Sequence, residues 1–289
     1  MRGARAKYDG LSRTTRVSIE MNAKSASPPE ATILFRQVTY SVNGNASRPI
    51  IDCISLEIHC GETLVLLGRS GSGKTTLLKL INSLLSPQSG QVLVQGRSTS
   101  EWDAIRLRRG IGYVIQEGGL FPHFTVAQNI ALVPTLEKWE AARIAKRVEE
   151  LLTLVGLDPR EFAARHPHEL SGGQRQRVGV ARALAADPPI LLMDEPFGAL
   201  DPVTRAELQH EFSNLARRLG KTIVFVTHDL REALLLASRI VLLQSGHIVA
   251  CGTPQEFLQI DHPEVKAFAA SLGAFTNGAA RDTVPGAPV

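Results

Sequence analysis

Hydrophobic residues along the chain follow two distinct patterns. In residues 32–40 (TILFRQVTY) and 50–59 (IIDCISLEIH), apolar and polar residues largely alternate, which predicts antiparallel strands with one exposed face. Other segments are continuous apolar runs, as expected for strands buried on both faces of a sheet. These runs are residues 62–68, 189–195, 221–229 and 238–246.

Helical patterns separate the buried runs, and the first predicted helix covers residues 74–85. Strands that alternate with helices predict a parallel sheet with right-handed crossovers, so we expect an α/β fold. Residues 121–186 are almost entirely helical in pattern. Within them, Thr125 and Gln128 fit a capping box, and a helix over 137–155 is predicted to end at Gly156. We interpret this stretch as a helical subdomain inserted into the α/β core.

Composition and charge limit the class of protein. The chain has 289 residues, of which 44% are hydrophobic, and no apolar run is long enough to span a bilayer. Residues 1–30 and 273–289 are expected to be disordered tails around one domain over 31–272. The N-terminal tail holds six basic and three acidic residues, so it supplies +3 of the net charge of +4. The domain itself is therefore close to neutral, which argues against nucleic acid as a partner. Three cysteines show no metal-ligand spacing and are expected to be reduced and mostly packed.

A glycine-rich loop follows the first buried run. Residues 68–75, GRSGSGKT, match the pattern G-x-x-x-x-G-K-[ST], with a strand before the loop and a helix after it. Its backbone N–H groups and the helix N-terminus favour a phosphate group, Lys74 is placed to reach the β- and γ-phosphates, and the Thr75 hydroxyl is suited to Mg²⁺. A flexible Gly/Ser turn is the alternative, and the strand–loop–helix context disfavours it.

Acidic residues end the second buried run. Asp194 is expected to hold Mg²⁺ and Glu195 to activate a water molecule, because two adjacent carboxylates imply a nearby cation. A solvated acidic turn is the alternative, which the flanking apolar residues and proline weaken. His228 follows another buried strand and is either a packing residue or a contact of the γ-phosphate. Gln116 also follows a short strand, and on its own a lone glutamine indicates nothing.

The sequence LSGGQRQR at residues 170–177 predicts a second phosphate site. Ser171 is suited to cap a helix, and Gly172 and Gly173 at the helix start expose backbone N–H groups. One chain thus has two phosphate-binding helix starts. Both could serve the same nucleotide only if two copies of the domain meet.

With these motifs in this order, the chain closely resembles the ATP-binding subunits of ABC transporters. The resemblance covers about residues 33–272 and includes the following motifs: the Walker A loop (68–75), the Q-loop glutamine Gln116, the signature LSGGQ (170–174), Walker B (190–195), the D-loop (198–201) and the switch histidine His228. It implies a P-loop NTPase fold of the ABC type. That fold has a RecA-like parallel core, an antiparallel β subdomain and an inserted helical subdomain.

The resemblance also implies a head-to-tail dimer with ATP at the interface. Nucleotide contacts are expected from Gly68, Arg69, Ser70, Gly71, Ser72, Gly73, Lys74, Thr75 and Thr76, and contacts to the partner's ATP from Ser171, Gly172, Gly173 and Gln174. Glu195 would be the general base and His228 would position the γ-phosphate. Thr75, Gln116 and Asp194 would surround Mg²⁺, and Asp201 would act in the D-loop.

Two positions depart from the usual pattern of the family. Family members usually stack adenine on an aromatic residue where this chain has Val42, and Tyr40, two residues earlier on the same strand face, is the candidate substitute. Arg69 replaces a common proline. Its side chain is expected to point outward, because only backbone groups line that turn.

The separation of the ATPase from any membrane span favours a prokaryotic importer, working at the cytoplasmic face of the membrane. Its expected partners are two transmembrane permease subunits, a substrate-binding protein and a second copy of itself. Residues 108–134 resemble importers of osmoprotectants such as glycine betaine, choline or carnitine, although the regulatory CBS domains common in that group are not expected here. An importer of another small solute, such as an amino acid, is the alternative, and a non-transport ABC ATPase is a further one.

Overall fold

The fold was analysed in a computed structural model, which describes residues 31–42, 49–115, 119–198 and 200–278, and the side chains of these up to residue 272. The predicted N-terminal tail and most of the predicted C-terminal tail lie outside the described residues. The last helix, α10 (Pro263–Gly278), continues past residue 272, where the domain was predicted to end.

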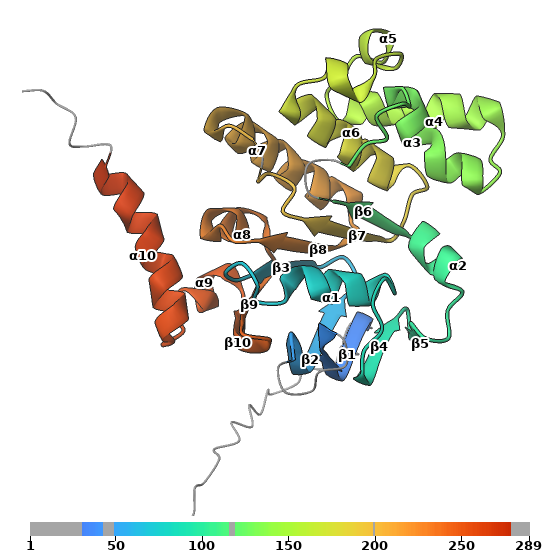
Figure 1. Cartoon of the computed structure of the whole chain (residues 1–289). Coiled ribbons are helices and arrows are strands. Elements are labelled where there is room, and N and C mark those ends of the chain that lie inside the picture. The colour runs from blue at the N-terminus through green and yellow to red at the C-terminus, as the bar shows by residue number, and fades with distance from the viewer. Residues whose placement is uncertain (1–30, 43–48, 116–118, 199, 279–289) are drawn as a thin grey trace, which may run out of the picture.

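Two β-sheets form the framework of the molecule (Figure 1). The four-stranded sheet has the order β2-β1-β4-β5 and is antiparallel. Its strands are β1 (Ala31–Tyr40), β2 (Ile51–His59), β4 (Ser89–Val94) and β5 (Arg97–Ser98). The two strands predicted from alternating residues, β1 and β2, are thus confirmed as an antiparallel pair.

The six-stranded sheet has the order β10-β9-β3-β8-β7-β6 and is parallel from β9 to β6. Its strands are β3 (Thr63–Leu67), β6 (Ile111–Val114), β7 (Ile190–Asp194), β8 (Thr222–Thr227), β9 (Arg239–Gln244) and β10 (His247–Gly252). β10 pairs with β9 in the antiparallel sense. The four continuous apolar runs form β3, β7, β8 and β9, as predicted.

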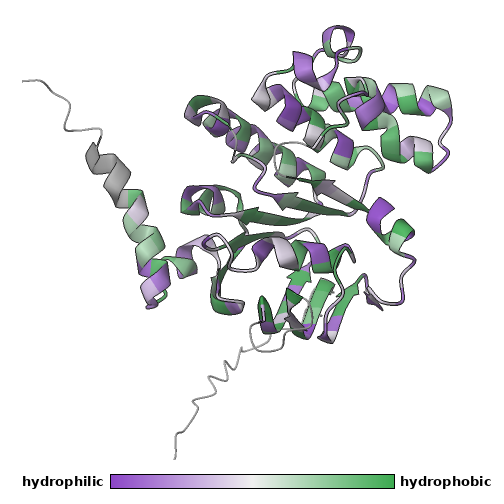
Figure 2. Ribbon diagram, in the orientation of Figure 1, coloured by the Kyte–Doolittle hydropathy of each residue, from purple (hydrophilic) through white to green (hydrophobic). Residues whose placement is uncertain are grey.

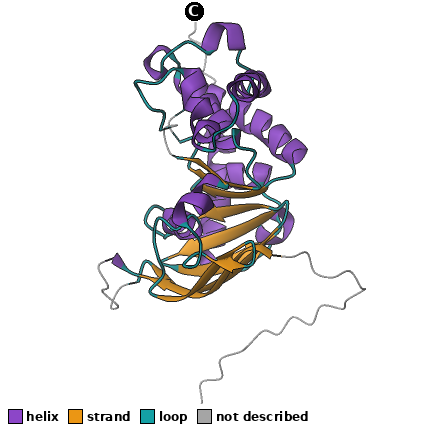
Figure 3. Ribbon diagram, turned by 90° about the vertical axis from the view of Figure 1, so that its right-hand side faces the viewer, coloured by secondary structure: helices purple, strands orange, loops and turns teal. Residues whose placement is uncertain are grey.

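Helices cover both faces of the parallel sheet, and further helices pack on one another beyond it. They are α1 (Lys74–Ile81), α2 (Ala104–Arg109), α3 (Val126–Leu136), α4 (Ala141–Leu154), α5 (Pro159–Phe162), α6 (Gly172–Leu184), α7 (Pro202–Leu219), α8 (Leu230–Leu236) and α9 (Pro254–Phe257), with a short 3₁₀ turn at Pro167–Glu169. Figure 3 shows that helices gather at one end of the molecule and strands at the other. The helical end holds α3 to α6, which confirms the predicted helical insertion.

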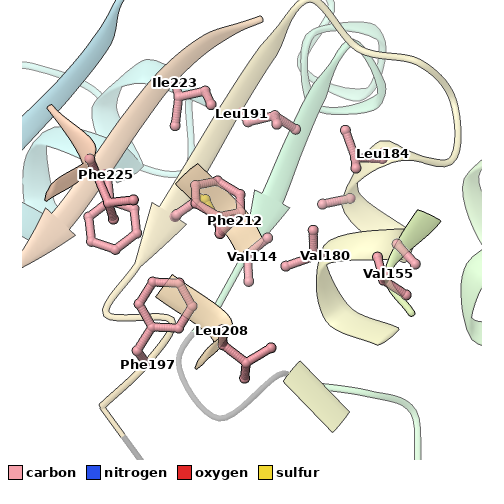
Figure 4. Close-up of a cluster of buried hydrophobic side chains, with 14 of the residues drawn as sticks. Val114, Val155, Val180, Leu184, Leu191, Phe197, Leu208, Phe212, Ile223 and Phe225 are labelled. Carbon is pink, nitrogen blue, oxygen red and sulfur yellow. The ribbon is translucent and has the colours of Figure 1, made fainter. Parts of the chain in front are cut away.

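The hydrophobic core has two parts, one on each face of the parallel sheet. One part joins α1 to strands of both sheets, with Leu77 and Leu78 fully buried. The other joins the opposite face to α6, α7 and α8, and includes the aromatic cluster of Phe197, Phe212 and Phe225 (Figure 4). Strands of the parallel sheet are apolar along their length, whereas the outer helices mix apolar and polar residues (Figure 2). Burying each such phenylalanine contributes roughly 1.5–3 kcal/mol.

Two predicted helix boundaries were wrong. The helix predicted over 137–155 begins only at Ala141, because Lys138 adopts a left-handed conformation (φ 57°) that separates α3 from α4. The first helix ends at Ile81 rather than at residue 85, since Ser83 also has a positive φ of 54°. Gly156 follows α4 with φ 71°, as the cap prediction requires.

The cysteines were also predicted incorrectly. Cys53, Cys60 and Cys251 are free, but each is an exposed residue rather than a packed one. No helix in the described parts of the chain combines the length and hydrophobicity that crossing a bilayer requires.

Candidate functional site

The predicted site residues follow strands of the parallel sheet. The glycine-rich loop follows β3, Glu195 follows β7, and His228 follows β8, and these three strands are neighbours in the order β3-β8-β7. Carboxyl ends of parallel strands share one edge of a sheet, so the fold brings these segments together. Gln116, which comes after β6 in the sequence, lies outside the described residues.

Residues 68–75 form a tight loop between β3 and α1. Gly71 and Gly73 have φ values of 78° and 106°, in the left-handed region that favours glycine. A Cβ on Gly73 would also lie 2.9 Å from the Ile50 carbonyl oxygen, so the loop leaves no room for a side chain there. The buried hydroxyl of Ser72 has no hydrogen-bond partner among the described residues. A loop of this shape, ending at a helix N-terminus, fits a phosphate group.

Lys74 is buried inside this loop, with a relative exposure of 4%. Its Nζ donates hydrogen bonds to the carbonyl oxygens of Gly68 (2.8 Å) and Arg69 (2.9 Å). Burial lowers the pKa of Lys74, while the carboxylates of Glu195 and Asp194 oppose that shift. The ammonium is therefore held at the centre of the loop, within the field of both carboxylates.

The side chain of Arg69 leaves the loop, as predicted. Its Nε lies 2.6 Å from Glu264 Oε1 on α10, and the arginine side chain is 71% exposed whereas that of Glu264 is 11% exposed. Sequence reasoning missed this ion pair, because nothing near Arg69 in the sequence indicates a partner 195 residues away. The pair links the glycine-rich loop to the C-terminal helix.

Thr75 and Asp194 form a set of hard oxygen ligands. Thr75 Oγ1 donates to Asp194 Oδ1 at 2.9 Å, and the Tyr113 hydroxyl lies 3.4 Å from Asp194 Oδ2. Burial raises the pKa of Asp194, although the hydrogen bond from Thr75 opposes that shift. Tyr113 was not predicted; its place on β6, beside β7, brings it to Asp194.

A hydroxyl next to a carboxylate fits Mg²⁺, which is usually bound by one or two protein oxygens together with substrate phosphates. The described residues contain no cluster of three or more His, Cys, Asp or Glu side chains suited to hold a metal without such a substrate. The Thr75 hydroxyl and the Asp194 carboxylate fit a metal ion that phosphate oxygens also bind.

Glu195 and His228 are in direct contact. His228 Nδ1 lies 3.1 Å from Glu195 Oε2, and the histidine side chain is 62% exposed whereas that of Glu195 is 25% exposed. Glu195 has a positive φ of 44°, which is a costly conformation for a residue with a side chain. Such strain right after a buried strand is typical of functional positions.

Asp201 starts α7 just beyond the turn that follows β7. Its Oδ1 accepts a hydrogen bond from the Thr204 backbone N–H at 3.1 Å, so it is an N-cap. That contact with Thr204 also lowers the pKa of Asp201. Asp201 is thus charged and fixed at the start of a helix, in the segment that was predicted to be the D-loop.

Ser171 caps α6 through a capping box, as the sequence predicted for this helix start. Its Oγ accepts from the Gln174 backbone N–H at 3.2 Å, and its own N–H donates to Gln174 Oε1 at 2.9 Å. Gly172 opens the helix, and a Cβ on Gly173 would lie 2.7 Å from Thr204 Cγ2 on α7. Within the described residues, no hydrogen bond joins Ser171–Gln174 to the glycine-rich loop, Glu195 or His228. The hydrogen bonds of the second predicted phosphate site are thus local to the start of α6.

The region predicted to contact adenine lies beside the glycine-rich loop. Tyr40 is the last residue of β1 and its carbonyl accepts from the Ile50 N–H at 2.8 Å, while the Ile50 carbonyl abuts Gly73. The argument that Tyr40 and Val42 share a strand face was wrong, because β1 ends at Tyr40. Tyr40 packs partly against the core, whereas Val42 is 51% exposed.

Known proteins share this sequence and this fold. The ABC transporter family model matches residues 51–198. The chain is 57% identical over 209 residues to the glycine betaine/carnitine/choline transport ATP-binding protein OpuCA of Bacillus subtilis, an alignment that covers 72% of this chain and 55% of that protein. It is 53% identical over 208 residues to the osmoprotectant import ATP-binding protein OsmV of Salmonella typhimurium, which covers 72% of this chain and 54% of that protein.

A solved structure agrees with these alignments. The ATP-binding cassette MJ0796, in a dimeric post-hydrolysis state bound to ADP and Pi, matches with a TM-score of 0.68 and 35% identity, over 77% of this chain and 98% of that one. The chain spans about half the length of the curated relatives it matches. The fold, the family match and these identities agree, and the chain belongs to the ABC transporter family as an ATP-binding domain.

Proposed function

We propose that this chain binds ATP with Mg²⁺ and hydrolyses it to drive the import of a small solute. The contact between Glu195 and His228, at the sheet edge that also holds the glycine-rich loop, is the observation that carries this proposal. This contact brings together two groups close to a loop shaped for phosphate. The Glu195 carboxylate can accept a proton, and the His228 imidazole can bind an anion.

The glycine-rich loop would hold the phosphates of ATP. Backbone N–H groups of residues 68–76 (Gly68, Arg69, Ser70, Gly71, Ser72, Gly73, Lys74, Thr75 and Thr76) would surround the β-phosphate, and the Lys74 ammonium would exchange its two loop carbonyls for phosphate oxygens. Tyr40 and Val42 would flank the adenine, since the end of β1 adjoins the loop. Thr75 and Asp194 would hold Mg²⁺, with Gln116 as a further ligand. When bound, the metal neutralises charge on the phosphate oxygens.

Hydrolysis would use Glu195 as the general base. A water molecule attacks the γ-phosphorus while its proton passes to the Glu195 carboxylate, and the bond to the β–γ bridging oxygen breaks to release ADP. His228 would hold the γ-phosphate and the attacking water in line. Its contact with Glu195 supports this role, because two groups 3.1 Å apart could act on the same water molecule.

A second copy would complete the site. Ser171, Gly172, Gly173 and Gln174 would contact the ATP held by another chain, and the hydrogen bonds of Ser171 and Gln174 to each other hold this helix start in shape for it. The exposed Ser171 at the N-terminus of α6 suits the γ-phosphate. Asp201, at the start of α7, would lie at the same interface. The dimeric state of the cassette MJ0796 supports this arrangement.

The solute is proposed to be an osmoprotectant of the quaternary-amine type. Support comes from OpuCA and OsmV, which act in glycine betaine, carnitine, choline or osmoprotectant import. Two transmembrane permease subunits would carry the solute, delivered by a substrate-binding protein, and the ATPase would sit against them at the cytoplasmic face of the membrane. Closure on ATP and release after hydrolysis would move the permease subunits. No role in nucleic-acid binding is proposed.

Reconstitution tests this function. The chain would be assembled with its permease subunits in vesicles, and uptake of labelled glycine betaine, choline and carnitine would be measured with and without ATP. ATP-dependent uptake of a quaternary amine supports the proposal. ATP turnover without uptake of any of these three solutes would leave the ATPase proposal intact and overturn the substrate class.

A further inference from the structure

A buried carboxylate outside the predicted site lies next to the switch histidine in the fold. Glu232 on α8 is 4% exposed, and no motif in the sequence marks it. Its Oε2 accepts a hydrogen bond from Thr227 Oγ1 at 2.5 Å, and its Oε1 accepts one from Gln209 Nε2 on α7 at 2.8 Å. Both oxygens therefore have a donor, and each donor comes from a different element.

Thr227 connects this carboxylate to His228. It is the last residue of β8 and is itself buried, at 2% exposure. While its hydroxyl donates to Glu232, the same oxygen accepts from the Asp229 backbone N–H at 2.9 Å. That second bond closes a turn around His228. Glu232 thus orients the Thr227 hydroxyl. That hydroxyl in turn fixes the backbone before and after His228.

The helix that carries Gln209 also holds the segment after Glu195. Arg205, one turn before Gln209 on α7, donates hydrogen bonds to the carbonyl oxygens of Phe197 (3.1 Å), Gly198 (3.2 Å) and Leu200 (3.0 Å). Residues four apart on a helix share a face. One face of α7 therefore holds the turn after β7, which follows Glu195, and also Glu232, which accepts the hydrogen bond from Thr227 next to His228.

Burial of a carboxylate is costly unless its hydrogen bonds are satisfied. Burial raises the pKa of Glu232, while the hydrogen bonds from Thr227 and Gln209 and the charge of Arg205 oppose that shift. A well-packed apolar residue would link α7 to α8 at lower cost, so packing alone does not account for a carboxylate here. The need for a group that accepts hydrogen bonds from both Thr227 and Gln209 does account for it.

We infer that Glu232 is a positioning residue for ATP hydrolysis, which holds His228 in contact with Glu195 through Thr227. This inference rests on the proposed ATPase activity. Among the described residues, the side-chain hydrogen bonds of Glu232 go to Thr227 and Gln209 and not to the glycine-rich loop or Glu195. Its loss would therefore disturb the geometry of the reacting groups without removing a nucleotide contact. Turnover would fall while ATP affinity stays the same.

The test compares turnover and ATP affinity in the full-length chain. Glu232→Met keeps the approximate volume but removes the acceptor, and Thr227→Val removes the hydroxyl. Each variant should lower kcat about tenfold or more, since small misplacements of reacting groups have effects of that size. The dissociation constant for ATP should stay within about twofold, and Thr227→Ser should restore turnover. Glu207→Met, at an exposed carboxylate on α7, is the matched control and should behave like the wild type.

A double-mutant cycle with His228→Ala separates positioning from a merely structural role. If Glu232 acts through His228, adding Glu232→Met to His228→Ala should cause no further loss of turnover. An equal loss in both backgrounds, or wild-type kcat in Glu232→Met, would overturn the inference. If Glu232→Met does not fold, the same cycle is run with Thr227→Val and Thr227→Ser. An inactive wild-type chain would instead refute the proposed ATPase, which keeps the two failures distinct.

Discussion

His228 Nδ1 lies 3.1 Å from Glu195 Oε2, although the two residues follow different strands and are 33 positions apart in sequence. The distance results from the parallel pairing of β7 and β8, which places the ends of both strands at one edge of the sheet. A base and an anion-binding group thereby share one site. The predictions below depend on that site and on the loop beside it.

Replacing Glu195 by Gln removes the proton acceptor but keeps the size and polarity of the side chain. Turnover should fall by about 10²–10³-fold, because general bases contribute on that order, while ATP affinity stays near that of the wild type. Sedimentation in the presence of ATP should show a stable dimer for this variant. Rapid turnover by Glu195→Gln would rule out its role as the base.

Lys74 and Arg69 form a matched pair of cations in one loop. Lys74→Ala should weaken ATP binding and lower turnover by about 10²-fold or more, because it deletes a buried charge aimed into the loop. Arg69→Ala should change ATP affinity little, since its side chain points away toward Glu264. The ion pair with Glu264 is open to solvent on the arginine side, so its loss should lower the stability of the fold only slightly. Calorimetric titration with ATP distinguishes the two, and equal losses for both variants would contradict the loop geometry described here.

The fold and much of the site follow from local patterns in the sequence. Continuous apolar runs identified β3, β7, β8 and β9, and turn chemistry identified the caps at Thr125 and Ser171. Asp194 and Glu195 were found because they are adjacent in sequence. The sequence did not predict Tyr113, Glu232 or the partner of Arg69, since their contacts depend on sheet order and helix packing. The boundaries at residues 85 and 137 failed because non-glycine residues with positive φ, Ser83 and Lys138, carry no reliable sequence signal.

Asp194→Asn should make the nucleotide-free chain more stable at neutral pH, although it removes a metal ligand. Because burial raises the pKa of Asp194, the folded state binds that proton more tightly than the unfolded chain does. Stability conferred by the wild-type residue is therefore lost as the pH rises from the ordinary aspartate value through the folded value. The variant lacks this loss, and its Oδ1 still accepts from Thr75. Melting temperatures from pH 4 to 8, without Mg²⁺, should diverge as the pH increases; parallel curves would contradict the prediction.

Val42→Tyr should tighten ATP binding if an aromatic platform beside the glycine-rich loop is missing. Stacking on a base contributes about 1 kcal/mol or more, which corresponds to about a fivefold lower dissociation constant. The affinities for GTP, CTP and ATP should all increase, because stacking does not require specific hydrogen bonds. Unchanged affinity would indicate that Tyr40 or another group already serves this purpose, and Val42→Leu is the control for added bulk.

The central claim is that each ATP lies between Lys74 of one copy and Ser171 of the other. Lys74→Ala and Ser171→Arg chains, each inactive alone, should therefore complement each other when mixed, because the mixed dimer has one intact site. Half of the dimers in an equal mixture are mixed, so turnover should recover to about a quarter of the wild-type rate. Turnover of the mixture that does not exceed the sum of the two separate variants would contradict the shared site.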